Sequence, residues 1–352
     1  MHPMYKEKRQ SRSEFVPIRG LAYHVRIWPA ALAETTAAPL VLVHGWMDVA
    51  ASWQFMVDAF DDAFLAGRCI IAPDWRGFGL TQATNGGEAT TVGGPSSPAG
   101  AAEPALPGRR RSAPSGGSAV REATSVGADI FWFPDYLADL DFLLDHFSPA
   151  QPVDLVGHSM GGNVAMMYAG ARPGRIRKLV NLEGFGLAAS EPAQAPARYA
   201  SWMDALKTLH RGELDLKAYP DASGVARRLM KTNPRLTPDK ADWLASHWAR
   251  PDESGQWRIL GNAGHKVPSA SLYRVDEALA MYRAIRAPVL AVEADGDSLH
   301  AWWKGKYTLA DYHQRLQQVP NARVAVLADA GHMLHHDQPE ALAGLIEGFL
   351  AD

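Results

Sequence analysis

The pentapeptide G-H-S-M-G at residues 157–161 constrains this chain more than any other feature. A short apolar run, 153–156, precedes it and predicts a β-strand, and an alanine-rich segment with helical character, 164–170, follows it. This is the G-x-S-x-G pattern in a strand–turn–helix context, where a sharp turn projects the serine hydroxyl clear of the backbone. The flanking glycines relieve crowding in such a turn. The helix that follows directs free N–H groups at the same place, so the pattern predicts Ser159 as a nucleophile beside an oxyanion site.

Apolar runs alternate with helical patterns along most of the chain. The runs are short and continuous, as expected of strands buried on both faces of a sheet, and lie at 39–43, 69–72, 153–156, 179–182, 288–292 and 323–327. A hairpin is predicted before them, with strands at 15–18 and 21–28, and an amphipathic helix over 339–350 closes the chain. Strands that alternate with helices predict an α/β fold with a mostly parallel central sheet flanked by helices.

The alternation stops between residues 187 and 286, where helical patterns, prolines and large aromatic residues predominate. We interpret 187–286 as a helical cap inserted between two strands of one sheet, so that the core consists of residues 1–186 and 287–352. The aromatic side chains of this segment favour a mainly apolar substrate pocket. They are equally consistent with a small hydrophobic core of the cap itself.

The segment 83–128 has a different composition from the rest of the chain. Glycine and proline make up 14 of its 46 residues, and it contains no aromatic residue. Such a composition is typical of low-complexity or disordered sequence, because too few apolar side chains are present to offset the entropy lost on ordering. We predict a disordered loop here. The basic run Arg109-Arg110-Arg111 inside it is interpreted as a solvated charge run of a linker.

Charge and hydropathy exclude several classes of partner. The 352 residues carry a formal net charge of −3, which does not favour binding to nucleic acid or to an anionic membrane. No apolar run approaches the roughly 20 residues that span a bilayer. The N-terminal residues are polar and lack the apolar core of a signal peptide, and the only cysteine, Cys69, cannot form an internal disulfide. These features predict a cytoplasmic protein that acts on a small molecule.

Four further motifs accompany the serine pentapeptide in a fixed order. They are H-G-W at 44–46, D-W-R-G-F-G at 74–79, E-A-D-G-D at 293–297 and G-H at 331–332. With these motifs the chain resembles the serine hydrolases of the α/β-hydrolase fold, over nearly its whole length apart from 83–128. Serine, then an acid, then histidine is the order in which that family carries its catalytic triad.

The resemblance implies a role for each matching residue. Ser159 is the expected nucleophile and His332 the general base. The backbone N–H groups of Met160 and Trp46 are the expected oxyanion hole. The expected acid follows a late strand, and the spacing from Ala294, which stands where the family usually has glycine, favours Asp297. Asp295 is the competing candidate. Glu183, after the strand at 179–182, is a third, because some family members keep their acid there.

Other polar residues receive structural interpretations. His44 and His158 match motif positions that hydrogen-bond within loops, and Asp74 is expected to brace a loop. The run 335–337, His-His-Asp, has the residue types of a metal site, but catalytic zinc sites usually combine histidine pairs at helical spacing with a distant ligand. We therefore expect no metal and no cofactor.

The predicted function is a carboxylesterase-like serine hydrolase that cleaves an ester or related acyl bond through an acyl-enzyme, on a substrate with an apolar group. The same triad also serves carbon–carbon bond hydrolases, lactonases, amidases and cofactor-free perhydrolases. A non-catalytic ligand-binding protein on this scaffold is the alternative from another class, and loss of a triad residue would indicate it. Serine at position 159 argues against epoxide hydrolases and haloalkane dehalogenases, which need aspartate there.

Overall fold

A computed structural model describes residues 4–30, 37–83 and 131–351. The predicted loop at 83–128 lies outside these residues except for Ala83, which ends a short strand, β5 (Gln82–Ala83), paired with β2. The described chain contains no helix long and apolar enough to cross a membrane.

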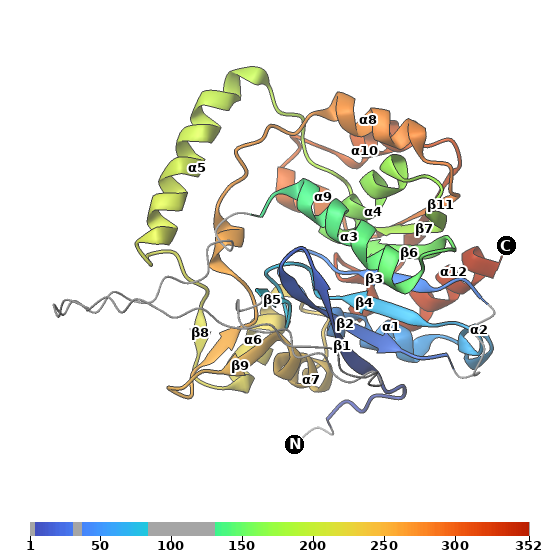
Figure 1. The fold of residues 1–352 in the computed structure, drawn as a ribbon, viewed down its shortest axis with the longest axis horizontal. Helices are drawn as coiled ribbons and strands as arrows, with labels where there is room; N and C mark the ends of the chain where they lie inside the picture. Colours follow the sequence, from blue (N-terminus) through green and yellow to red (C-terminus); the bar gives the residue numbers. More distant parts are fainter. Residues whose placement is uncertain (1–3, 31–36, 84–130, 352) are drawn as a thin grey trace, which may run out of the picture.

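The molecule is built around a mostly parallel sheet, as predicted (Figure 1). Only the pairs that involve β2 are antiparallel, namely those with β1, β4 and β5, and the hairpin of β1 and β2 forms one edge. Across the sheet the strands are β1 (Arg12–Ile18), β2 (Leu21–Trp28), β4 (Ile70–Pro73), β3 (Leu40–Val43), β6 (Val153–His158), β7 (Ile176–Leu182), β11 (Val289–Ala294) and β12 (Ala322–Leu327). Each strand predicted from an apolar run is confirmed, with bounds shifted by at most three residues.

Helices cover both faces of this sheet because its strands present apolar side chains alternately to each side. In β3, Val41 and Val43 belong to one hydrophobic core, and Leu40 and Leu42 to the other. The first core contains residues of α3 (Phe133–Phe147), α4 (Met160–Ala171), α8 (Val275–Ala284), α9 (Ser298–Trp303) and α10 (Leu309–Leu316). The second contains residues of α1 (Gln54–Ala59), α2 (Asp62–Leu65), α11 (Leu334–Asp337) and α12 (Pro339–Ala351).

The segment between β7 and β11 is inserted into the sheet order, as predicted, but it is not purely helical. It contains α5 (Ala195–His210), α6 (Ala222–Thr232), α7 (Pro238–Trp248) and a three-stranded antiparallel sheet of β8 (Ala218–Tyr219), β10 (Trp257–Ile259) and β9 (Ala249–Pro251). Its last helix, α8, packs against α4 of the main fold. Beside the predicted helices the cap therefore contains a small antiparallel sheet, in which the turn at 252–256 joins β9 and β10 into a hairpin.

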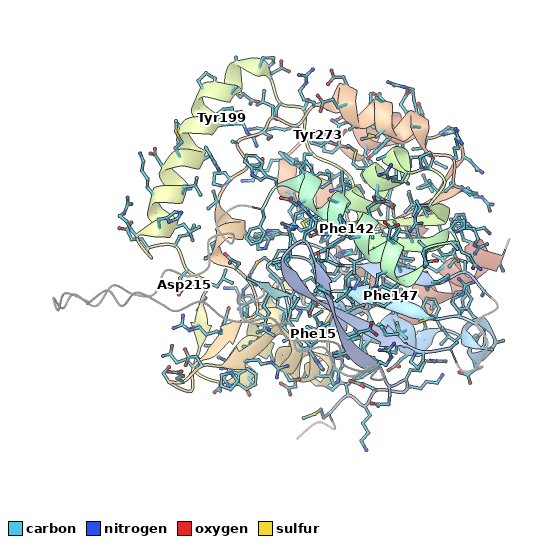
Figure 2. The ribbon with its side chains drawn as sticks, in the orientation of Figure 1. Phe15, Phe142, Phe147, Tyr199, Asp215 and Tyr273 are labelled. Carbon is cyan, nitrogen blue, oxygen red and sulfur yellow. The ribbon has the colours of Figure 1, made fainter. Side chains whose placement is uncertain are left out.

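Most of the large aromatic residues of the insertion pack internally. Trp243, Trp248 and Trp257 join a third hydrophobic core that also includes Phe55 of α1. Tyr282 belongs to the first core. In contrast, α5 has no buried residue, and Tyr199 on it is 51% exposed (Figure 2). Core formation thus accounts for these tryptophans, and they do not by themselves indicate an apolar pocket.

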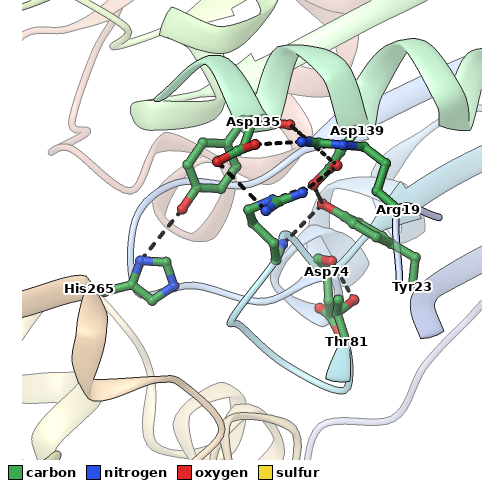
Figure 3. Close-up of polar contacts among 9 residues, drawn as sticks. Arg19, Tyr23, Asp74, Thr81, Asp135, Asp139 and His265 are labelled. Atoms are coloured by element: carbon green, nitrogen blue, oxygen red, sulfur yellow. Dashed lines mark hydrogen bonds and ion pairs between the residues drawn. The ribbon is translucent and has the colours of Figure 1, made fainter. Parts of the chain in front are cut away.

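An ion network connects the two flanks of residues 84–130 (Figure 3). Arg76, in the loop after β4, donates to the buried carboxylate of Asp139 on α3 at 2.6 and 2.7 Å. Arg19 of the hairpin turn donates to the same carboxylate at 2.9 Å, and to Asp135 at 2.6 Å. Two guanidinium groups around a fully buried carboxylate supply the charge partners that such a group needs. The network therefore fixes where the chain leaves and re-enters the described fold.

Candidate active site

Ser159 occupies a strained turn between β6 and α4. Its φ of 53° and ψ of −115° lie outside the regions that residues with a Cβ prefer. Its N–H donates to the carbonyl of Leu182 at the end of β7, and its own carbonyl accepts from Asn163 in the first turn of α4. These bonds hold the strained conformation, so the hydroxyl stands at the carboxyl edge of the sheet, where open α/β sheets bind ligands.

The glycines of the pentapeptide are required by close packing. A Cβ on Gly161 would lie 2.2 Å from the carbonyl oxygen of Val43, and one on Gly157 would lie 2.4 Å from the carbonyl oxygen of Gly161. Real Cβ atoms do not approach a backbone oxygen so closely. The absence of these side chains lets α4 begin directly against β3 and β6.

Gly161→Ala should therefore destabilise the fold by about 3 kcal/mol or more, because the clash is with backbone that cannot rotate away. Gly344→Ala is the matched control, since Gly344 also lies in a helix but has nothing within 4 Å of an added Cβ. That control should raise stability by about 0.5–1 kcal/mol through helix propensity. Urea unfolding measures both, and equal stability of the two variants would contradict the packing argument.

His332 lies next to the serine turn, in the loop between β12 and α11. Its backbone carbonyl accepts a hydrogen bond of 2.7 Å from Nε2 of His158, the residue that precedes Ser159. The rings of His158 and His332 have centroids 4.7 Å apart. The predicted base thus contacts the residue that precedes the predicted nucleophile.

The carboxylate that contacts His332 is Glu183. Nδ1 of His332 lies 3.1 Å from Oε2 of Glu183, and the other carboxylate oxygen accepts from the N–H of Ala294 at 2.8 Å. Glu183 directly follows β7, its side chain is 1% exposed, and its φ is 53°. A histidine that donates from Nδ1 to a buried carboxylate keeps the lone pair of Nε2 free to accept a proton.

The preference for Asp297 as partner of His332 is corrected by this geometry. The Asp297 carboxylate accepts from the N–H of His300 at 2.8 Å and so caps the N-terminus of α9. Asp295 accepts from the N–H groups of Asp329 and Ala330 at 2.9 and 3.2 Å, which braces the loop that leads to His332. An aspartate three residues before a helical N–H is a recognisable N-cap signal, and it would have pointed away from Asp297.

Burial shifts the pKa values of both members of the pair. It raises the pKa of Glu183 to about 7, despite the opposing hydrogen bond from Ala294, and it lowers the pKa of His332 to about 4. Each shift reflects removal of the charged form from water. Below neutral pH Glu183 is therefore mostly protonated, and an ionised Glu183 beside a neutral His332 predominates only at higher pH.

The residues expected to brace loops do so. Nδ1 of His44 donates to the carbonyl of Gly45 at 2.7 Å, and Nε2 accepts from the N–H of Trp75 at 2.9 Å. Asp74 accepts from the N–H groups of Ala50 and Leu80 at 2.7 and 2.8 Å. These bonds support the loop after β3, on which Gly45 lies so close to the serine turn that an added Cβ would be 3.2 Å from Cβ of Ser159.

Two exposed tryptophans belong to segments around this site, one in the loop after β3 and one on α9. Trp46, which follows Gly45, is 53% exposed, and Trp302 on α9 is 50% exposed. The ring of Trp302 meets that of His332 edge-to-face, with centroids 4.2 Å apart. No motif pointed to Trp302, because its position depends on where α9 lies over His332.

Comparison with known proteins identifies the family. The sequence model of the alpha/beta hydrolase fold family matches residues 38–339, and the chain belongs to this family. The serine hydrolase-like protein of Danio rerio is 24% identical over 232 residues, which cover 62% of this chain and 66% of that protein.

Solved structures share the fold at low sequence identity. A thioesterase domain from the curacin biosynthetic pathway has a TM-score of 0.69 at 21% identity, covering 96% of this chain and 99% of that one. A hypothetical protein from Pseudomonas aeruginosa PAO1 has a TM-score of 0.70 at 20% identity, covering 97% and 99%. An esterase from Mycobacterium tuberculosis has a TM-score of 0.59 at 17% identity, covering 97% and 92%.

Proposed function

We propose that this protein is a serine hydrolase that cleaves an ester or a related acyl bond through a Ser159–His332–Glu183 triad. The observation that carries the proposal is the combination of a strained serine turn with a histidine whose Nδ1 lies 3.1 Å from a buried carboxylate. The esterase and thioesterase neighbours carry the same fold, and their acyl chemistry agrees with this assignment.

In the proposed reaction, Ser159 Oγ adds to the substrate carbonyl carbon while its proton passes to Nε2 of His332. The N–H groups of Met160, the first residue of α4, and of Trp46 donate to the oxyanion that forms. Each such donor contributes on the order of 3 kcal/mol in studied enzymes. The leaving alcohol takes the proton from His332, and a water molecule then repeats the sequence on the acyl-serine to release the acid.

The proposed substrate has an apolar acyl or alcohol group. Exposed tryptophans are costly to leave in water, and Trp302 lies against the proposed base, so an apolar chain that covers its face removes area from water close to the reacting carbonyl.

The proposal is tested by a labelled fluorophosphonate probe and by hydrolysis of p-nitrophenyl esters of graded chain length. The expected results are stoichiometric labelling of Ser159, located by mass spectrometry, and kcat/KM that rises from acetyl to longer acyl chains. A protein that neither labels nor hydrolyses any ester would be a non-catalytic member of the family. Labelling without ester hydrolysis would indicate that the enzyme acts on amides, lactones or carbon–carbon bonds instead of esters.

The pH dependence of the reaction follows from the Glu183–His332 pair. Glu183 must be ionised and His332 neutral, and burial raises the pKa of Glu183 to about 7 while it lowers that of His332 to about 4. The last proton to leave as pH rises is therefore that of Glu183. We expect kcat/KM to rise with pH through an apparent pKa of about 7. Below this pH, log kcat/KM should rise with a slope of 1, and the apparent pKa is a property of the Glu183–His332 pair as a whole. A profile that stays flat from about pH 5 to about pH 9 would contradict this assignment.

Trp302→Ala should weaken the use of long-chain substrates selectively. We expect KM for long-chain esters to rise about tenfold, the equivalent of about 1.4 kcal/mol of lost apolar burial, with little change for acetate esters. Phe142→Ala is the matched control, because Phe142 is 53% exposed on α3 (Figure 2) and takes no part in the proposed site. An equal effect on short and long esters would assign Trp302 to the support of His332 instead.

A further inference from the structure

A second cluster of polar side chains lies behind the serine turn. Asp48 follows β3, His158 ends β6 and His335 lies on α11, so three separate segments contribute. The residues are 3%, 2% and 0% exposed, and one ligand atom from each lies within 4.8 Å of the other two. Three ionisable groups thus meet in the interior, where each needs a partner.

Several atoms of this cluster have no hydrogen-bond partner among the described residues. They are Oδ2 of Asp48, Nδ1 of His158 and both ring nitrogens of His335. Oδ1 of Asp48, by contrast, accepts from Val49 N–H and from the hydroxyl of Ser52, which fixes the orientation of the carboxylate. Nε2 of His335 lies 3.8 Å from Oδ2 of Asp48, beyond hydrogen-bond length.

The hydrogen bond of His158 defines which of its nitrogens is available. Nε2 contacts the carbonyl of His332, which only accepts, so Nε2 carries the proton. Nδ1 of the neutral ring therefore presents a lone pair to Asp48 and His335. A histidine whose other nitrogen donates to a backbone carbonyl is the usual arrangement of a metal ligand in proteins.

We propose that Asp48, His158 and His335 form a buried binding site for a divalent transition-metal ion of the zinc class, and that its occupation inhibits the enzyme. The inhibitory part rests on the proposed hydrolase function, whereas the binding part does not.

The donor set suits such an ion. Two imidazole nitrogens and one carboxylate oxygen are ligands that zinc accepts, with a fourth position left for water. Bonds of about 2.0–2.2 Å place neighbouring ligand atoms roughly 3.4 Å apart in a tetrahedron, so atoms now within 4.8 Å must close by about an ångström. Rotation of the His335 side chain, whose two ring nitrogens have no hydrogen-bond partner among the described residues, can supply that movement.

This set differs from the run 335–337 that the sequence suggested. Asp337 accepts from Gly331 N–H at 2.9 Å and from Asn233 at 2.7 Å, so its two oxygens are engaged elsewhere. Only His335 is shared, and the other two ligands come from segments far away in sequence.

Closure around an ion would disturb the proposed active site through two connections. His158 holds the carbonyl of His332 and precedes Ser159, and Asp48 stands two residues after Trp46. A displacement of about 1 Å in a catalytic constellation costs about 100-fold in rate. Because the ligands are buried, entry of the ion requires local opening, and inhibition should develop slowly during preincubation.

Binding is tested first without reference to activity. Untagged full-length protein carrying Cys69→Ser, to remove the only thiol, is titrated with Co²⁺ and Zn²⁺ by visible absorption and calorimetry. We expect one tetrahedral ion per chain. Asp48→Asn, which keeps the shape, and His335→Gln should each weaken binding at least 10–100-fold, the loss seen even for outer-shell partners. His313→Gln is the matched control, because His313 pairs with Glu293 at 2.7 Å outside the cluster.

Crystals soaked in Zn²⁺ and the activity assay complete the test. An anomalous peak bonded to Asp48, His158 and His335 is expected. No binding, a water molecule alone at this position, or equal binding by Asp48→Asn and His335→Gln would overturn the site. In the activity assay, Zn²⁺ should slowly lower ester hydrolysis about 100-fold in the wild type. Full activity of the wild type with Zn²⁺ bound would overturn the inhibitory role but not the binding site. A metal-free wild type without ester hydrolysis would count against the proposed function instead.

Discussion

Ser159→Ala should lower kcat for ester hydrolysis by about a millionfold, the loss that removal of a triad serine produces in studied enzymes. The variant should also lose fluorophosphonate labelling completely. The substitution removes one hydroxyl and keeps the Cβ, so the strain of the turn is unchanged and the melting temperature should stay within a few degrees. Residual activity from the oxyanion donors alone, roughly 10³–10⁴-fold over water, is expected.

The decisive outcome for Ser159 is the combination of lost chemistry and retained fold. Met203→Ala, an exposed position on α5, serves as the control for handling and should behave as the wild type. If Ser159→Ala still labels fully with the probe, another nucleophile carries the reaction. If it unfolds, the loss of activity says nothing about chemistry, and Ser159→Cys, which keeps a nucleophile of similar size, replaces it in the labelling assay.

Glu183→Gln should lower kcat by about 10³–10⁴-fold, because an amide in place of the carboxylate no longer fixes the histidine tautomer or stabilises its charged form. Asp297→Asn should leave kcat within about twofold, since asparagine caps a helix as well as aspartate does. Asp295→Asn, which keeps an acceptor for Asp329 and Ala330, is the second control. A larger loss in Asp297→Asn than in Glu183→Gln would return the role of the acid to Asp297.

Glu183→Gln should not reduce the free energy of unfolding at alkaline pH, although it reduces activity. The pKa of the buried Glu183 carboxyl is raised to about 7 from an ordinary value of 4.5, so its protonated form stabilises the fold at low pH. That contribution, on the order of 3 kcal/mol, is fully present below pH 4.5 and is lost as pH rises through 7. The glutamine variant has no such loss, and its urea midpoint should equal or exceed that of the wild type at pH 8. A stability loss parallel to the activity loss would indicate a structural role.

The sequence predicted the fold and the strained turn that carries Ser159 because both depend on local patterns. Each buried strand is a continuous apolar run, and the strand–turn–helix around Ser159 lies within about 20 consecutive residues. The close approach of Gly161 to the backbone of Val43 explains why the sequence has glycine at this position. The position of His332 beside this turn was also predicted, because its motif follows the last strand directly.

Which carboxylate contacts His332 was decided only by the tertiary structure. β7 and β11 are parallel neighbours, so Glu183, Asp295 and Asp297 all follow strands that end at one edge of the sheet. Sequence spacing favoured Asp297, but the helix that begins after it captures its carboxylate, while Glu183 points at His332. Whether a carboxylate caps a nearby helix or contacts His332 depends on the positions of segments more than 100 residues apart in sequence, and local sequence patterns do not contain that information.

The cluster of Asp48, His158 and His335 shows the same division. Each residue alone reads as a polar loop residue, and His335 was associated in sequence with its neighbours His336 and Asp337. The sheet order places β3 beside β6, and α11 packs against α1 on the same face. Parallel strands bring their carboxyl ends together whatever their separation along the chain, so side chains from distant motifs meet there. The sequence determined which chemistry is available at that edge, and the packing of strands and helices decided which groups face one another.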